Sequence, residues 1–151
     1  MIDQASADPH NLIRFVEAQA NSYDRALSEI SSGHKRSHWM WYIFPQFAGL
    51  AYSSTSMFYS IKSIAEAKAY LSHSVLGPRL LECMEAVVRV DGRTAIEIFG
   101  LPDDMKLRSC ATLFAQVSPT NSVFERLLDK YFQGEVDEKT VRLLGAENES
   151  G

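Results

Sequence analysis

The sequence predicts a compact all-α domain of about seven helices, and local patterns of three kinds support this prediction. Serine or threonine is followed three residues later by glutamate at Ser63, Thr94 and Ser122, which is the spacing of a helix capping box. Apolar residues recur at helical spacing, and the alternation with hairpin turns that is typical of β-sheets is absent. We therefore expect one helical domain over residues 1–151, with flexible ends at 1–7 and 146–151.

The first helix is expected to be long. Asp8 suits an N-cap and Pro9 the first helical position. Apolar residues then recur along one face as far as Ile30. Gly33 is the expected end of this helix, because glycine readily adopts the conformation that terminates helices.

The aromatic segment 39–44 follows, and it should end at Phe44 because proline disfavours a helical conformation in the residue before it. Either a helix or a short two-stranded element suits this segment, since aromatic and β-branched residues are also common in strands. Residues 45–56 are expected to form a loop. The remaining helices should begin near Ser63, Gly77, Thr94, Asp103 or Asp104, Ser122 and Asp137, and the last should end near Leu144.

Composition indicates an ordinary globular protein, with 46% hydrophobic and 23% charged residues among 151. The formal net charge of −4 argues against nucleic-acid binding unless a local basic patch exists. Cys83 and Cys110 lie on apolar stripes, which predicts buried free thiols. With no signal peptide and no apolar run near the ~20 residues that cross a bilayer, a cytoplasmic protein without membrane contact is expected. The oligomeric state stays open.

The segment that includes Lys35, His38, Trp39 and Trp41 is the first candidate site. Cations just beyond a helix C-terminus are favoured by the helix dipole, which by itself explains their presence. The alternative is anion recognition, in which a tryptophan stacks on an aromatic ligand. His38 is also the best candidate for a catalytic acid or base, because its ordinary pKa lies close to neutrality.

Large aromatics in the same segment are also expected to pack in the core, and at least three of Trp39, Trp41, Phe44 and Phe47 should do so. Gln46 differs from them, because a buried amide needs partners. It is expected either to bond to the backbone or to bind a polar group of a ligand.

The second candidate segment is residues 103–112, at the start of a helix. Lys106, Ser109 and Thr112 are spaced by three residues, and Arg108 lies four residues before Thr112, so a cation and hydroxyls are placed to meet a phosphate or carboxylate. The alternative is a solvated face on which Asp104 and Arg108 form an ion pair across four residues.

Metal binding is not expected. His34 and His38 have the four-residue spacing of helical metal ligands, but Lys35 and Arg36 between them would repel a divalent cation. No nucleotide-binding glycine loop, zinc protease motif or serine elbow occurs, so the sequence predicts no cofactor and assigns no reaction.

Four groups of residues carry a resemblance to a known family: residues 14–19 (Arg14 to Gln19), 37–46 (Ser37 to Gln46), 66–71 (Glu66 to Leu71) and 106–114 (Lys106 to Phe114). With these, the chain resembles a bacterial family known as domain of unknown function 1810, some of whose members carry the label calpastatin. The resemblance implies a multihelical fold and supplies no reaction, cofactor or catalytic residue. Calpastatin's inhibitory segments are disordered, which does not match an aromatic-rich compact domain.

These patterns lead to one preferred hypothesis, a small anionic ligand such as a nucleotide or an ADP-ribose-like molecule bound between the two segments. The residues expected to bind it are Lys35, His38, Trp39, Trp41, Gln46, Lys106, Arg108, Ser109 and Thr112. One alternative is a protein interaction module without enzymatic activity. Another is an enzyme that acts on nucleic acid or its modifications, whose binding should weaken steeply with salt.

Overall fold

In the computed structural model, which describes residues 8–150, the chain forms ten helices and no extended strand. Seven of these helices have at least seven residues, so the predicted all-α fold is confirmed. Flexible ends were expected at residues 1–7 and 146–151: residues 1–7 and Gly151 lie outside the described residues, and residues 146–150 belong to the last helix. The helices are α1 (Ile13–Gln19), α2 (Tyr23–Ser31), α3 (Met40–Ile43), α4 (Ser54–Tyr59), α5 (Ile64–Ser72), α6 (Leu76–Arg89), α7 (Ala95–Phe99), α8 (Asp103–Ala115), α9 (Val123–Phe132) and α10 (Glu138–Ser150).

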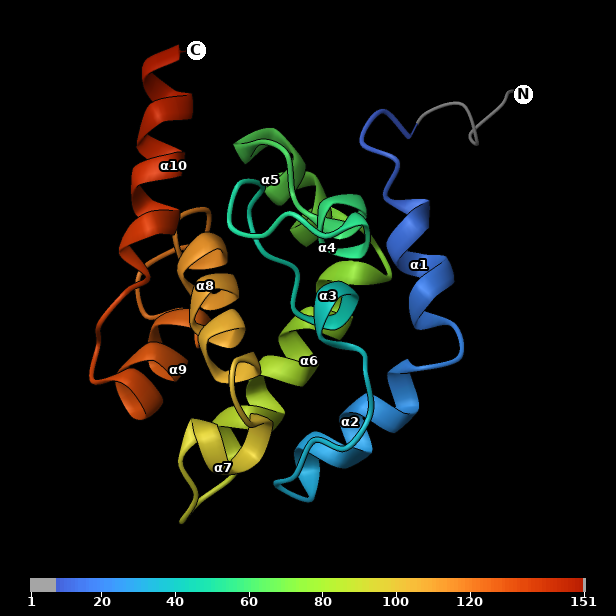
Figure 1. Ribbon diagram of the computed structural model, residues 1–151, viewed down its shortest axis with the longest axis vertical. Helices are drawn as coiled ribbons and strands as arrows, with labels where there is room; N and C mark the ends of the chain where they lie inside the picture. Colours follow the sequence, from blue (N-terminus) through green and yellow to red (C-terminus); the bar gives the residue numbers. More distant parts are fainter. Residues whose placement is uncertain (1–7, 151) are drawn as a thin grey trace.

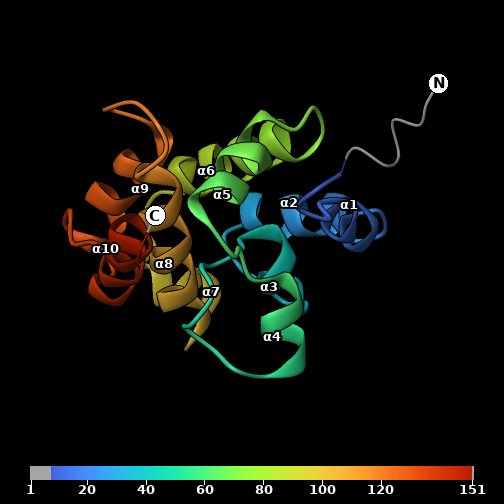
Figure 2. The same cartoon turned by 90° about the horizontal axis from the view of Figure 1, so that it is seen from above.

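Helix α6 lies at the centre of the arrangement and contacts α2, α5 and α9. In Figures 1 and 2, α1 lies at one side of the molecule and α10 at the opposite side. Helix α8 packs against α7, α9 and α10, while α3 contacts α1 and α4. Buried apolar side chains from nearly all of these helices form one continuous core.

The single long helix expected from Asp8 to Gly33 is wrong, because two shorter helices, α1 and α2, occupy this region. Asp8 instead accepts the backbone N–H groups of Leu12 and Ile13 ahead of α1. The break after Gln19 directs its side-chain amide inward, where it donates to the Tyr42 carbonyl at 2.8 Å. Tertiary bonds of this kind compensate for the helical bonds that the break removes.

The aromatic segment is the short helix α3 and not a strand. Within the described residues the isolated β-bridge joins Phe47 to Ile61. The predicted loop 45–56 is also too long, since α4 begins at Ser54 and the Ser53 side chain accepts the Ser56 N–H as its N-cap. Helix α10 likewise continues past the expected end at Leu144.

All three predicted capping serines or threonines accept the expected backbone N–H. The full reciprocal box forms at Thr94 and Glu97. At the other two helices the glutamate reaches one residue further back: Glu66 accepts from the Lys62 N–H at 2.8 Å, and Glu125 from the Asn121 N–H at 2.7 Å. Capping spacing therefore located these helix starts correctly, although the acceptor of the second bond differs.

Helices α5 and α6 meet at a close backbone contact that requires glycine. A Cβ atom on Gly77 would lie 2.1 Å from the carbonyl oxygen of Leu71, closer than any real contact allows. This close approach accompanies the short connection between α5 and α6, and Cys83 on α6 is buried in the core. Burial raises the pKa of Cys83 to about 12 and also raises that of Cys110, and both are free thiols as expected.

In the described part of the chain, each helix is too short or too polar to cross a lipid bilayer.

Candidate functional site

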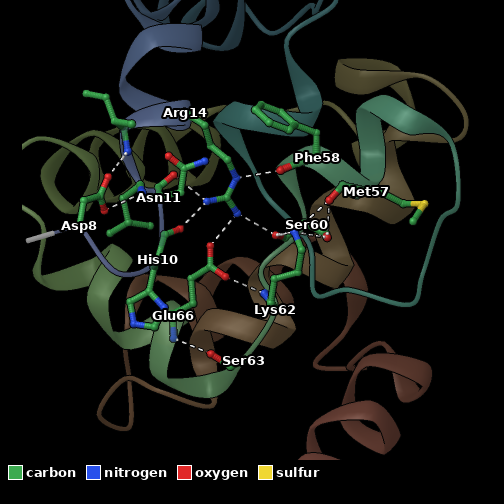
Figure 3. Close-up of polar contacts among 12 residues, drawn as sticks. Asp8, His10, Asn11, Arg14, Met57, Phe58, Ser60, Lys62, Ser63 and Glu66 are labelled. Carbon is green, nitrogen blue, oxygen red and sulfur yellow. Dashed lines mark hydrogen bonds and ion pairs between the residues drawn. The ribbon is translucent and has the colours of Figure 1, made fainter. Parts of the chain in front are cut away.

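A groove between the start of α1, helix α4 and the start of α5 has a volume of about 710 Å³. We call it the Arg14 groove. Figure 3 shows Arg14 at its floor, facing Glu66, with Met57 and Phe58 at its edge. Size alone makes it a candidate binding site.

Every N–H donor of the Arg14 guanidinium is already used. Its Nη2 forms a buried ion pair with Glu66 at 2.6 Å and also donates to the Ser60 carbonyl at 2.9 Å (Figure 3). Nε donates to the Phe58 carbonyl at 2.7 Å, and Nη1 donates to the carbonyls of His10 and Asn11. Since a guanidinium has five N–H groups, none remains for a ligand.

Lys62 lines the same groove, and its N–H donors are likewise all used. Its Nζ donates to the Met57 carbonyl and to both the carbonyl and the hydroxyl of Ser60, at 2.8–3.1 Å. Burial and then the charge of Arg14 lower the pKa of Lys62. These cations hold the α1, α4 and α5 segments together, and an anionic ligand would find no free donor on them.

The second candidate consists of two adjoining hollows that share Trp41 and Lys106 on their walls. We call them together the Trp41 cavity. The Lys35 chamber has a volume of about 370 Å³ and is lined by Lys35, His38, Met40, Trp41, Tyr42, Ser53, Thr55, Asp103 and Lys106. The Gln46 chamber has about 250 Å³ and is lined by Trp41, Gln46, Leu50, Ala51, Pro102, Met105, Lys106, Ser109, Asp137 and Lys139.

Two lysines from distant parts of the chain converge on one carboxylate in the Lys35 chamber. The Nζ atoms of Lys35 and Lys106 lie 2.8 Å and 3.0 Å from the two oxygens of Asp103. Lys106 Nζ also lies 4.0 Å from the centre of a Trp41 ring, a cation–π contact. Burial raises the pKa of Asp103, but the hydrogen bonds from Lys35 and Lys106 outweigh this effect and the pKa is lowered. Two ammonium groups against one carboxylate leave the chamber with a net positive charge.

The loop that carries Lys35 and His38 is held by Glu29 from helix α2. Glu29 accepts the backbone N–H groups of Arg36 and Ser37, the Ser37 hydroxyl and the Trp39 indole N–H, at 2.6–3.0 Å. Burial raises the pKa of Glu29, but these hydrogen bonds outweigh it and lower the pKa to about 2. The loop is therefore fixed, and Lys35 Nζ donates to the Ser37 carbonyl within it at 2.6 Å.

Of the nine residues predicted to bind a ligand, six line the Trp41 cavity: Lys35, His38, Trp41, Gln46, Lys106 and Ser109. The two candidate segments therefore meet in space. His38 is exposed on the wall of the Lys35 chamber, and its imidazole has no hydrogen-bond partner among the described residues.

Trp39 does not line this cavity. It is 1% exposed and packs against Phe44 and Phe99, while its indole N–H donates to Glu29. Trp39, Phe44 and Phe47 are buried whereas Trp41 is partly exposed, so the expectation of at least three core aromatics is confirmed.

Arg108 and Thr112 lie on another side of α8. Arg108 donates to the carbonyls of Glu135 and Val136 at 3.1 and 2.7 Å, and so it joins α8 to the segment before α10. Thr112 is fully buried and accepts the Asp137 N–H at 2.9 Å. The alternative expectation of an Asp104–Arg108 ion pair is wrong, since Arg108 pairs with Glu135 and the buried Oδ1 of Asp104 has no described partner.

Sequence reasoning missed Asp103, Glu29 and Asp137 as parts of the site. Asp103 and Asp137 were expected only as residues that begin helices. Glu29 is a charged residue in the last turns of the first predicted helix, where a solvent-exposed side chain is expected. The arrangement of each depends on partners far away in the chain, such as Lys35 for Asp103. No local pattern singles out Glu29, because the groups that it binds lie in residues 36–39, beyond the end of its helix.

Comparison with known proteins identifies the family of this chain but assigns it no activity. Residues 9–144 match the family DUF1810, described as a protein of unknown function. A crystal structure of the conserved hypothetical protein Rv1873 from Mycobacterium tuberculosis is similar to this structure, with a TM-score of 0.90 and 51% sequence identity, over 91% of this chain and 99% of that one. No protein of curated function matches the sequence. Because the family match spans most of its length, the chain belongs to the DUF1810 family.

Proposed function

We propose that the Trp41 cavity binds a small anionic ligand, such as a nucleotide or an ADP-ribose-like molecule. The observation that carries this proposal is the pair of ammonium groups of Lys35 and Lys106, which share the single carboxylate of Asp103 in a hollow of about 370 Å³. An anion that enters this chamber supplies the negative charge that the pair lacks. The positive chamber is local, because the whole chain has a net charge of −4.

Both lysines keep unused donors. Lys35 Nζ donates to Asp103 and to the Ser37 carbonyl, which leaves one N–H, and Lys106 Nζ donates to Asp103, which leaves two. Lys62 in the Arg14 groove has no such capacity. The smaller hollow is therefore better suited to an anion than the larger one.

Trp41 has a positioning role beside the stacking role proposed for it. Lys106 Nζ lies 4.0 Å from the centre of a Trp41 ring, so the indole helps to position the ammonium. Trp41 lines both chambers. His38 adds a hydrogen bond to the anion from the chamber wall, and no reaction is assigned to it.

Thermal unfolding with a panel of ligands tests this proposal. Inorganic phosphate, AMP, ADP-ribose, sugar phosphates and small dicarboxylates would each be added to the full chain. A ligand at one hundred times its dissociation constant stabilises by ~2.7 kcal/mol, which raises the melting temperature by roughly 5 to 11 °C. The shift should fall to about half or less in Lys106→Met and persist in Lys62→Met. No shift with any compound would contradict the proposal.

Exposed apolar side chains support the alternative of a protein interaction module. Tyr52, Met57 and Phe58 are 73%, 52% and 52% exposed on and beside α4. Light scattering on the purified chain would test for self-association through this surface, and a monomer at all concentrations that is unchanged by Phe58→Ser would weigh against it.

A further inference from the structure

Gln46 presents an unusual group to the Gln46 chamber. Its side chain is only 8% exposed, and no described residue forms a hydrogen bond with either atom of its amide. Its backbone carbonyl accepts from the Ile61 N–H at 2.8 Å, so the backbone of this residue is firmly held. The atoms of this amide are not sealed from solvent, because Asp104 Oδ1 is the buried polar atom without a partner among the described residues. The amide therefore keeps its donors and its acceptor free at the chamber wall.

Other polar groups of the Gln46 chamber also have free capacity. The Ser109 hydroxyl donates to the Met105 carbonyl at 3.1 Å, which leaves the lone pairs of its oxygen. Asp137 accepts from the N–H and hydroxyl of Thr140 through Oδ2, and its Oδ1 has no partner in the described part of the chain. With Lys106 and Lys139 also on its wall, the chamber therefore offers both acceptors and donors, including the two donors of the Gln46 amide.

Several hydroxyl groups on one ligand would match this wall, because each hydroxyl both donates and accepts. A stacked planar ring fits less well, since Lys106 covers one face of Trp41. An anion is also better placed in the neighbouring chamber. There both oxygens of Asp103 are bound by lysines, whereas in the Gln46 chamber, which Lys139 also lines, Asp137 keeps a free carboxylate oxygen that would repel an anion.

We propose that the ligand of the Trp41 cavity is a sugar phosphate, either free or as the ribose phosphate of a nucleotide. Its phosphate lies in the Lys35 chamber and its hydroxyl groups lie in the Gln46 chamber. Lys106 lines both chambers and binds the phosphate at their junction. This inference rests on the proposed function, because the phosphate must bind for the hydroxyl groups to reach Gln46.

Calorimetric titration of the full chain with inorganic phosphate, ribose, ribose 5-phosphate and AMP tests the inference. Ribose 5-phosphate should bind at least about tenfold more tightly than phosphate, since two or more added hydrogen bonds give a factor of this size. Gln46→Met should remove this advantage and leave the affinity for phosphate unchanged. Tighter binding of AMP than of ribose 5-phosphate identifies a nucleotide as the source, and the reverse order identifies a free sugar phosphate.

A second readout separates a ligand-binding amide from a structural one. Because the Gln46 amide has no partner in the free protein, Gln46→Met should keep or raise the melting temperature without ligand. A structural amide would instead lower it. If Gln46→Met fails to fold, Ser109→Ala replaces it, with an expected loss of about threefold in affinity for ribose 5-phosphate and no loss for phosphate.

The outcomes distinguish this inference from the proposed function. If phosphate binds and Lys106→Met removes it, but ribose 5-phosphate and AMP bind no more tightly than phosphate, the sugar site is overturned and the anion site stands. If Gln46→Met and Ser109→Ala leave the preference for ribose 5-phosphate intact, the sugar site is again overturned. If neither phosphate nor any phosphate ester binds, both proposals fail.

Discussion

The Arg14 groove and the Trp41 cavity both place cations beside a carboxylate, but they differ in the donors that remain free. Arg14 and Lys62 use every N–H on carbonyls, a hydroxyl and Glu66. Lys35 and Lys106 share one carboxylate and keep spare donors, and Gln46 beside them is unpartnered among the described residues. The groove is larger, yet the cavity keeps the free donors that an anion needs, so we infer the binding site from free hydrogen-bonding capacity and not from volume.

This difference predicts that the two regions respond to mutation in opposite ways. Changes in the Arg14 groove should reduce stability and leave binding intact. Changes in the Trp41 cavity should reduce binding and leave stability nearly intact.

The largest expected effect is that of Arg14→Met. It leaves Glu66 as an unpaired charge at 2% exposure and removes a donor from each of four carbonyls, so the free energy of unfolding should fall by about 3–5 kcal/mol. Urea unfolding monitored by circular dichroism measures this change. The matched control, Arg25→Met on the exposed face of α2, should change it by less than about 0.5 kcal/mol. If Arg14→Met lowered the free energy of unfolding by less than about 1 kcal/mol, the hydrogen bonds of Arg14 to the four carbonyls and Glu66 would not stabilise the fold as we expect.

Glu29→Gln tests the support of the Lys35 chamber. The neutral amide cannot accept all four hydrogen bonds that Glu29 receives, so the free energy of unfolding at pH 7 should fall by about 1–3 kcal/mol. The pKa of Glu29 is lowered from 4.5 to about 2 by folding, so its contribution is complete above pH 4.5 and is lost as the pH falls towards 2.

Urea unfolding of wild type and Glu29→Gln at several pH values isolates this contribution. The pKa values of Asp8 and Glu85 are lowered too, so the difference between the two proteins is the quantity to follow. It should shrink below pH 4.5, whereas the exposed control Glu17→Gln should differ little from wild type at any pH. A difference that does not depend on pH would contradict the assignment.

The sequence predicted well those features that depend on neighbours in the chain. Capping residues located the starts of α5, α7 and α9, and apolar spacing identified the core faces. The break between α1 and α2 was missed because it depends on Gln19 bonding to Tyr42, a contact that no local pattern contains. The spacing of apolar residues favoured a continuous helix there, but the tertiary hydrogen bond of Gln19 accompanies a break in that helix.

The same division applies to the site. The spacing of three residues placed Lys106 and Ser109 on one face of α8, and both line the Gln46 chamber. The same spacing also included Thr112, which lies about one turn further along α8 and is buried. Arg108 was included for its charge and its four-residue spacing to Thr112, and the two residues do share a side of α8, but it is not the side that lines the cavity. The Asp103 bridge to Lys35 spans a long stretch of sequence, and a single sequence contains no signal for such a contact.

Lys106→Met should weaken binding of ribose 5-phosphate by at least about tenfold, since it removes a charge-assisted hydrogen bond. Its effect on stability should stay below about 1 kcal/mol, because the Asp103 ion pair is retained through Lys35. Calorimetric titration and urea unfolding measure the two quantities. Lys62→Met, in the Arg14 groove, is the matched control, and equal losses of binding in both variants would remove the distinction between the two regions.

Arg108→Met gives the smallest expected effect and sharpens the comparison within a single helix. Arg108 lies two residues after Lys106, and positions two apart on a helix face different directions. Because Arg108 donates to the Glu135 and Val136 carbonyls and does not line the cavity, its loss should cost about 1 kcal/mol of stability. The affinity for ribose 5-phosphate should change by less than about twofold, which calorimetry resolves. If Arg108→Met weakened binding as strongly as Lys106→Met, the ligand would have to approach from the α9 side of α8, and the Trp41 cavity would lose its place as the binding site.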